Sequence, residues 1–135
     1  MIWLLDTNAF SDLMREHPAF DKHLANLTET DLVSICPVVR GEILFGLEKL
    51  DPGKKRLELE TKAAQFFSIL HCEPITPTSA DHYAKVKIAR QKRGLALDEN
   101  DLWIAACALA LRATLVSRDG DFAQIDGLTV EDWTK

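Results

Sequence analysis

The sequence predicts an α/β fold in which helices cover both faces of a central, mainly parallel sheet, giving three layers. Short apolar runs of the length of buried strands alternate along the chain with longer segments whose apolar residues recur at helical spacing. With 135 residues and 47% apolar composition, the chain has the size of one ordinary domain. We therefore expect a single domain over residues 1–135, without an internal linker.

The first half of the chain supplies two predicted strands, each followed by helical segments. Residues 2–5 are apolar and form the first strand, and a short helix runs from Asn8 to near Pro18. A second helical stretch follows that proline. Residues 32–36 form the second strand, and the helix that comes next covers residues 38–50. The apolar residues of the second helical stretch are Phe20, Leu24 and Leu27.

The middle of the chain is mostly helical. Residues 54–68 predict an amphipathic helix, and residues 70–75 form a weak strand because Glu and Pro interrupt the apolar run. Thr78 or Ser79 is a suitable cap for the next helix, which runs to about Arg93.

The last third contains the most apolar helix and the final strands. Residues 98–112 form this helix, and a buried strand over residues 115–117 follows it directly. Residues 128–133 predict a last strand at the edge of the sheet. Because strands and helices alternate throughout, the strands should run parallel.

Four acidic residues fall where this fold would gather them. Asp6 and Asp119 follow buried strands, Glu42 lies on a helix soon after a strand, and Asp101 begins the most apolar helix. The carboxyl ends of parallel strands meet at one edge of the sheet, where ligands of such folds bind. Taken singly, Asp6 could cap a helix, Glu42 could be an exposed acid and Asp119 could belong to a turn. Together they predict a carboxylate cluster.

Carboxylate oxygens are the ligands that Mg²⁺ and Mn²⁺ prefer, and Mg²⁺ keeps several of its waters. One or two direct carboxylates, with the others acting through water, would therefore complete a site. Metal ions in such a site could activate a water and stabilise the leaving oxygen of a phosphodiester. Two further acids lie close by in the sequence, and we expect Asp98 to cap the apolar helix and Asp121 to be a loop residue.

Composition narrows the class of protein. Cys36, Cys72 and Cys107 are odd in number and widely spaced, which argues against a disulfide framework or a zinc site and favours reduced, buried thiols. The first apolar run ends at Asp6, too early for a signal peptide or a membrane span. We expect a soluble, cytoplasmic protein with no membrane contact.

A basic segment is the exception to the net charge of −5. Its five cations fall near the end of one predicted helix, where they could contact RNA phosphates or could instead complement the helix dipole. We expect Lys87, Arg90 and Arg93 to be the RNA-binding candidates. The five cations are Lys85, Lys87, Arg90, Lys92 and Arg93.

The order and spacing of several short motifs resemble the PIN domain over the whole chain, and VapC-type toxins of bacterial toxin–antitoxin pairs in particular. The motifs are Asp6-Thr7-Asn8, the segment 39–46 around Glu42, the segment 100–106 around Asp101, 115–119 ahead of Phe122, and the ending 127–133.

The resemblance implies a three-layer α/β/α PIN-like fold and a Mg²⁺- or Mn²⁺-dependent endoribonuclease, frequently a homodimer, that a small cognate antitoxin holds inactive. By the same resemblance, Asp6 and Asp101 are metal ligands, and Glu42 and Asp119 complete the acidic site directly or through water. Thr7 and Asn8 would orient Asp6 or its water.

Two other functions fit parts of the pattern. A phosphatase of the haloacid dehalogenase type also begins with an aspartate after its first strand, but it needs a second aspartate two residues later, where this chain has Asn8. A non-catalytic interaction module would keep the fold and lose one or more of the four acids. All four acids are present, which favours the enzyme.

Overall fold

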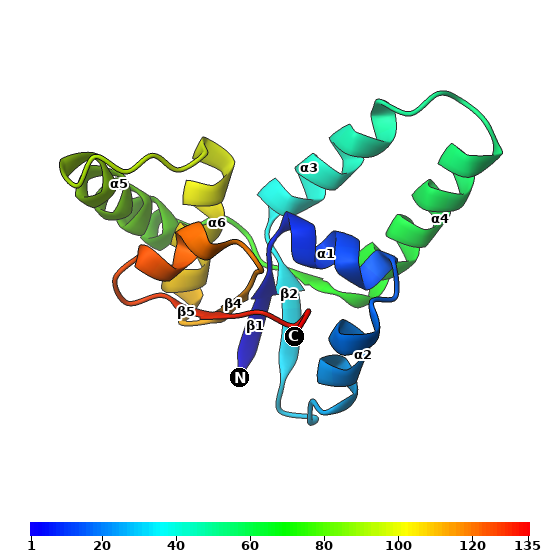
Figure 1. Ribbon diagram of the computed structural model, residues 1–135, viewed down its shortest axis with the longest axis horizontal. Coiled ribbons are helices and arrows are strands. Elements are labelled where there is room, and N and C mark those ends of the chain that lie inside the picture. The colour runs from blue at the N-terminus through cyan, green and yellow to red at the C-terminus, as the bar shows by residue number, and fades with distance from the viewer.

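The computed structural model describes residues 1–135 and has a five-stranded parallel sheet at its centre (Figure 1). The strands are ordered β3-β2-β1-β4-β5 across the sheet, and each neighbouring pair is parallel. The predicted three-layer α/β class is therefore confirmed. The strands are β1 (Ile2–Leu5), β2 (Leu32–Ile35), β3 (His71–Cys72), β4 (Thr114–Val116) and β5 (Thr129–Glu131).

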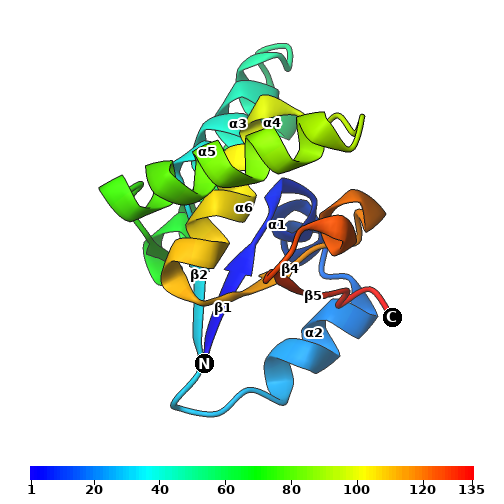
Figure 2. The ribbon, with the colours of Figure 1, turned by 90° about the vertical axis from the view of Figure 1, so that its left-hand side faces the viewer.

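Six α-helices flank this sheet. Helices α1 to α4 lie on one side, whereas α5 and α6 cover the other and face the viewer in Figure 2. The α3–α4 hairpin extends past the carboxyl end of the strands. None of the helices combines the length and the apolar content that a membrane crossing needs. The helices are α1 (Thr7–Met14), α2 (Pro18–Ala25), α3 (Pro37–Glu48), α4 (Lys54–Ile69), α5 (Pro77–Lys92) and α6 (Glu99–Leu111), and a short 3₁₀ turn, η1, covers Gly120–Gln124.

The strand order reverses between β1 and β4. The chain moves from β1 outward through β2 to β3 on one side, then crosses back over the other face to place β4 beside β1. Loops that leave such a switch point diverge to opposite faces and leave room for a ligand at the carboxyl ends of the two strands. Asp6 follows β1 at this point, and Asp119 lies three residues after β4.

Local sequence explains where the helices start. Pro18, Pro37 and Pro77 each occupy the first helical position, where the missing amide hydrogen costs nothing. Thr78 or Ser79 was expected to cap α5, but the cap is Thr76. Ser79 instead completes a capping box with Thr76, because its hydroxyl accepts the Thr76 amide at 3.2 Å.

Most buried positions of helix α6 carry small side chains, which lets the helix approach the sheet. Ala105 and Ala108 are fully buried, and they belong to a core cluster of 24 residues. The expectation of three buried thiols is wrong for Cys72, which is exposed on the short edge strand β3, whereas Cys36 and Cys107 are buried.

An aromatic cluster fixes the C-terminal segment to the rest of the fold. The Trp133 side chain is 1% exposed, and its ring centroid lies 5.2 Å from that of Trp3 and 5.1 Å from that of Phe20. The imidazole of His23 stacks on it at 5.6 Å. Residues after β5 thus contribute to the packing of β1 and α2.

Replacing Trp133 with Ala should lower the free energy of unfolding by about 3 kcal/mol, because the substitution leaves a large cavity among rings that cannot collapse onto one another. Chemical denaturation of purified protein measures the change. Leu57→Ala is the control, since Leu57 is 65% exposed and its loss should change stability by no more than about 0.5 kcal/mol. Equal effects of the two substitutions would contradict a packing role for Trp133.

Candidate active site

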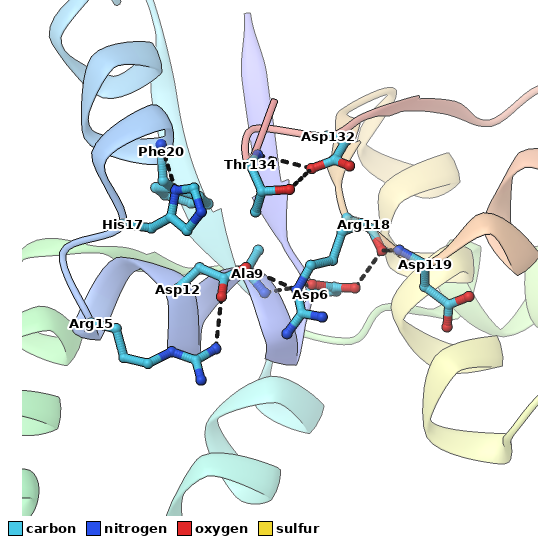
Figure 3. A network of polar contacts seen from close by, with 11 residues as sticks. Asp6, Ala9, Asp12, Arg15, His17, Phe20, Arg118, Asp119, Asp132 and Thr134 are labelled. Carbon is cyan, nitrogen blue, oxygen red and sulfur yellow. Dashed lines mark hydrogen bonds and ion pairs between the residues drawn. The ribbon is translucent and has the colours of Figure 1, made fainter.

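Asp6 is a buried carboxylate held by two hydrogen bonds at the end of β1. Its side chain caps α1, since Oδ1 accepts the amide hydrogen of Ala9 at 2.8 Å, and its Oδ2 accepts the hydroxyl of Ser117 at 2.5 Å (Figure 3). Burial raises the pKa of Asp6 above its usual value, and these two hydrogen bonds oppose that rise. The carboxylate is therefore fixed in one orientation at the switch point.

Ser117 is a site residue that the sequence analysis missed. It directly follows β4, and the pairing of Leu5 with Val116 brings Ser117 beside Asp6. Its hydroxyl donates to Asp6 and accepts the amide hydrogen of Asp119 at 3.0 Å. Ser117 thus connects the first acid to the loop that carries the fourth. A serine two residues before an acid that follows a strand was the signal that could have found it.

Glu42 lies on α3 and is held by Thr7. The Thr7 hydroxyl donates to Glu42 Oε1 at 2.6 Å, which joins the start of α1 to the face of α3. Thr7 and Asn8 were expected to orient Asp6 or its water. The direct hydrogen bonds to Asp6 come from Ala9 and Ser117 instead, and Asn8 is exposed. A role of Thr7 or Asn8 toward a water at Asp6 stays a prediction.

Asp101 is half-buried in the first turn of α6, and its pKa is raised to about 6. Burial is the largest cause, followed by repulsion from Asp98, Glu42, Asp119 and Asp6 in that order. A carboxylate feels this repulsion only from charges nearby. The structure therefore brings all four predicted acids into electrostatic range at Asp101, although they come from four separate segments.

The two neighbouring acids take the local roles expected of them. Asp98 caps α6, since its carboxylate accepts the amide hydrogen of Asn100 at 3.1 Å. Asp121 is exposed in η1, and its amide hydrogen is donated to Asp119 Oδ1 at 2.9 Å. Asp119 is thus a turn residue as well as a member of the cluster, and only one of its oxygens is used by the turn.

A buried aspartate paired with two exposed arginines supports the loop after β4. Asp12 on α1 is buried, and it accepts from Arg118 Nε at 3.1 Å and from Arg15 Nη2 at 2.7 Å (Figure 3). Because Arg118 immediately precedes Asp119, this pair ties the position of Asp119 to α1. The Arg118 guanidinium is also close enough to lower the pKa of Asp6 slightly. The sequence analysis missed Asp12, which looks like an ordinary helix acid.

The donor set suits a hard divalent cation. The cluster offers carboxylate oxygens only, with no thiol or imidazole among them, and it carries more negative charge than Arg118 can offset. No three acidic, histidine or cysteine side chains lie close enough together in this geometry to hold one metal ion among them. The fit to a metal therefore rests on the donor type, since Mg²⁺ can take one or two carboxylates directly and keep part of its water shell.

The basic segment is used largely by the fold. Arg90 is 5% exposed and donates to the carbonyl oxygens of Ala96 and Asp121, so the expectation that it contacts RNA is contradicted by its burial. Lys87 pairs with Glu99 at 3.2 Å on the surface. Arg93 is exposed and donates to the Gln124 carbonyl.

The chain is similar to known proteins along most or all of its length. The PIN domain family matches residues 3–128. Ribonuclease VapC2 of Rickettsia felis is 30% identical over 137 residues, and the match covers 100% of both chains. Ribonuclease VapC1 of Haemophilus influenzae strain R2866 is 30% identical over 140 residues, again with 100% of both chains covered.

Solved structures show the same fold. A crystal structure of VapBC2 from Rickettsia felis bound to a DNA fragment from their promoter has a TM-score of 0.89 and 29% identity, covering 98% of this chain and 99% of that one. VapBC-1 from nontypeable Haemophilus influenzae also has a TM-score of 0.89, with 26% identity and 100% of both chains covered.

The raised pKa of Asp101 predicts how the metal-free protein responds to pH. Because the folded chain holds this proton more tightly than the unfolded chain, the stabilisation is complete below about pH 3.8 and is lost as the pH rises through about 6. The substitution Asp101→Asn removes this loss of stability, because an amide does not ionise in this pH range. In EDTA, its melting temperature should therefore rise relative to the parent protein between pH 4 and pH 7.

Glu99→Gln is the matched control for this measurement. Glu99 lies in the same helical turn, but a hydrogen bond from Tyr83 lowers its pKa, so the corresponding difference should have the opposite sign. A constant difference between Asp101→Asn and the parent across this pH range would contradict the electrostatic coupling of the four acids.

Proposed function

Since the chain belongs to the PIN domain family, in its VapC ribonuclease branch, we propose that it is a metal-dependent endoribonuclease and the toxin of a toxin–antitoxin pair. It would hydrolyse phosphodiester bonds of RNA with an activated water. The observation that carries this proposal is the convergence of Asp6, Glu42 and Asp119 on Asp101, at the carboxyl ends of β1 and β4.

Each acid has a role in this proposal. Asp6 and Asp101 would hold Mg²⁺ or Mn²⁺, with Glu42 and Asp119 acting directly or through bound water. When bound, such an ion supplies an acidic water at neutral pH and positive charge for the phosphodiester oxygens. The chain itself needs no serine, cysteine or histidine nucleophile for hydrolysis of this kind.

The supporting residues hold the acids in position before any substrate arrives. Ser117 and the Ala9 amide fix both oxygens of Asp6, and Thr7 fixes one oxygen of Glu42. The ion pair of Asp12 with Arg118 steadies the loop that carries Asp119. Such fixed polar groups lower the cost of reorganisation during the reaction, which is a general source of catalytic power.

Partners follow from the same proposal. The VapBC names of the similar structures support a small antitoxin as a protein partner, and we propose that the chain also forms a homodimer. Lys87 and Arg93 remain candidates for phosphate contacts on the outer surface of α5, while Arg90 is not a candidate because it is buried.

Removal of the metal should stop the reaction. Four carboxylates repel a phosphodiester anion until a cation offsets their charge, so purified protein should cut labelled RNA with Mg²⁺ or Mn²⁺ and lose activity in excess EDTA. Restoring the metal should restore cleavage. Undiminished cleavage in excess chelator would rule out the metal-dependent mechanism.

Substitutions of the two acids at the start of α6, Asp98 and Asp101, should have different effects. Asp98→Ala should cost about 1 kcal/mol of stability, because it removes a helix cap, and should keep most of the cleavage activity. Asp101→Asn should stay folded and lose cleavage by more than about 100-fold, since the loss of a ligand exceeds that of a supporting group.

Calorimetric titration with Mn²⁺ and a labelled RNA assay compare the two variants. Weak Mn²⁺ binding by Asp101→Asn, together with near-normal binding by Asp98→Ala, is the expected result. If Asp98→Ala were the inactive variant that binds no Mn²⁺, Asp98 would be the ligand and Asp101 would not.

A further inference from the structure

A stripe of residues on α3 leads away from the acidic cluster. Glu42, Phe45 and Lys49 are spaced by three and four residues, so they share one face of the helix. A different face of α3 packs on the core through Val39 and Ile43. Phe45 is 64% exposed and contributes nothing to that core, so its ring is free for contact with another molecule.

An open hollow of about 610 Å³ lies along this stripe, a volume typical of ligand sites. Thr7 and Glu42 line the hollow at the end nearest the acids, and Asn100, the neighbour of Asp101, also lines it. Phe45 and Lys49 complete its wall. The hollow is therefore continuous with residues of the active site.

The surface of α3 around Phe45 is open. Gly41 and Gly46 lie on either side of it along α3, and even an added Cβ at either glycine would meet no atom within 4 Å. The Lys49 ammonium lies 4.8 Å from the ring centroid. This cation–π contact is weak at an exposed site, so a flat ligand could replace it.

Resting on the proposed function, we propose that Phe45 is a stacking platform for a nucleobase that flanks the scissile phosphate of single-stranded RNA. The base stacks on the Phe45 ring, and the side-chain amide of Asn100 can both donate to and accept from its edge. Phe45 is a positioning residue here, because it holds the base and does not touch the reacting bond.

The dimensions and charge favour RNA as the occupant. At the rise of an α-helix, Phe45 lies about 4.5 Å and Lys49 about 10.5 Å along the axis from Glu42. A base beside the cleaved phosphate and the phosphate one nucleotide farther on would then meet an aromatic ring and a cation in turn. That alternation of stacking surface and positive charge is the usual pattern for single strands.

The test uses the full chain and RNA of random sequence, from which sequencing of the cut ends gives the cleaved positions. A short RNA containing one such position is then made with an abasic nucleotide on either side of the cut. For the parent protein, one of the two abasic RNAs should lose about 5- to 150-fold in kcat/KM, the usual range for one stacked base.

Phe45→Ala should show the same loss on intact RNA and no further loss on the abasic RNA. Phe45→Trp should keep the parent behaviour, because a larger ring preserves stacking. Lys49→Gln should reduce the slope of binding against salt concentration by about one phosphate contact. The matched control is Leu44→Ala, which removes an adjacent exposed side chain of α3 that does not line this hollow.

Several results would overturn the proposal. If Phe45→Ala cuts intact RNA at the parent rate, or stays sensitive to the abasic nucleotide, Phe45 holds no base. If it cuts normally but no longer self-associates in sedimentation, the surface is an interface between copies of the chain. If the parent protein itself cuts no RNA in the library, the nuclease function has failed, an outcome distinct from failure of the Phe45 subsite alone.

Discussion

The parallel ladder between β1 and β4 pairs Leu5 with Val116, and this register carries the next residue of each strand to the same point. Asp6 and Ser117 meet there through a 2.5 Å hydrogen bond, and Ser117 in turn holds the amide of Asp119. A shift of this pairing by one residue would turn every side chain of the strand to the opposite face of the sheet. The geometry of the acidic cluster therefore depends on a contact between two buried strands that carry no catalytic group themselves.

The fold also tolerates an acidic cluster whose buried and mutually repelling carboxylates lower its stability. Burial and mutual repulsion disfavour the ionised forms of Asp6 and Asp101, and the chain offsets part of this cost with local partners. The Asp6 carboxylate accepts two hydrogen bonds, whereas that of Asp119 accepts one amide hydrogen of its own turn. The small residues of α6 complete the arrangement, because they let the helix bearing Asp101 approach the sheet closely.

The sequence could predict those features that follow from local patterns of residues. Two strands that end next to Asp6 and near Asp119, and the most apolar helix beginning near Asp101, could be predicted from periodicity and chain order alone. Ser117 and Asp12 were missed because their roles come from the β1–β4 register and from a contact 106 residues away along the chain. Arg90 was expected to be exposed for a related reason. A cation on a predicted helix looks exposed until the neighbouring segments that bury it are known.

Asp6 and Asp101 differ in how much the stability of the fold depends on their side chains. Asp6 is at once the cap of α1, the partner of Ser117 and a member of the acidic cluster. An apolar replacement at Asp6 would leave the amide hydrogen of Ala9 and the hydroxyl hydrogen of Ser117 without acceptors, a penalty that is a large fraction of the stability of a small domain. Asp101 has no comparable structural duty. In genetic terms, an apolar allele at Asp6 would lower the amount of folded protein, whereas, under the proposed function, the allele Asp101→Asn would leave a folded but inactive copy.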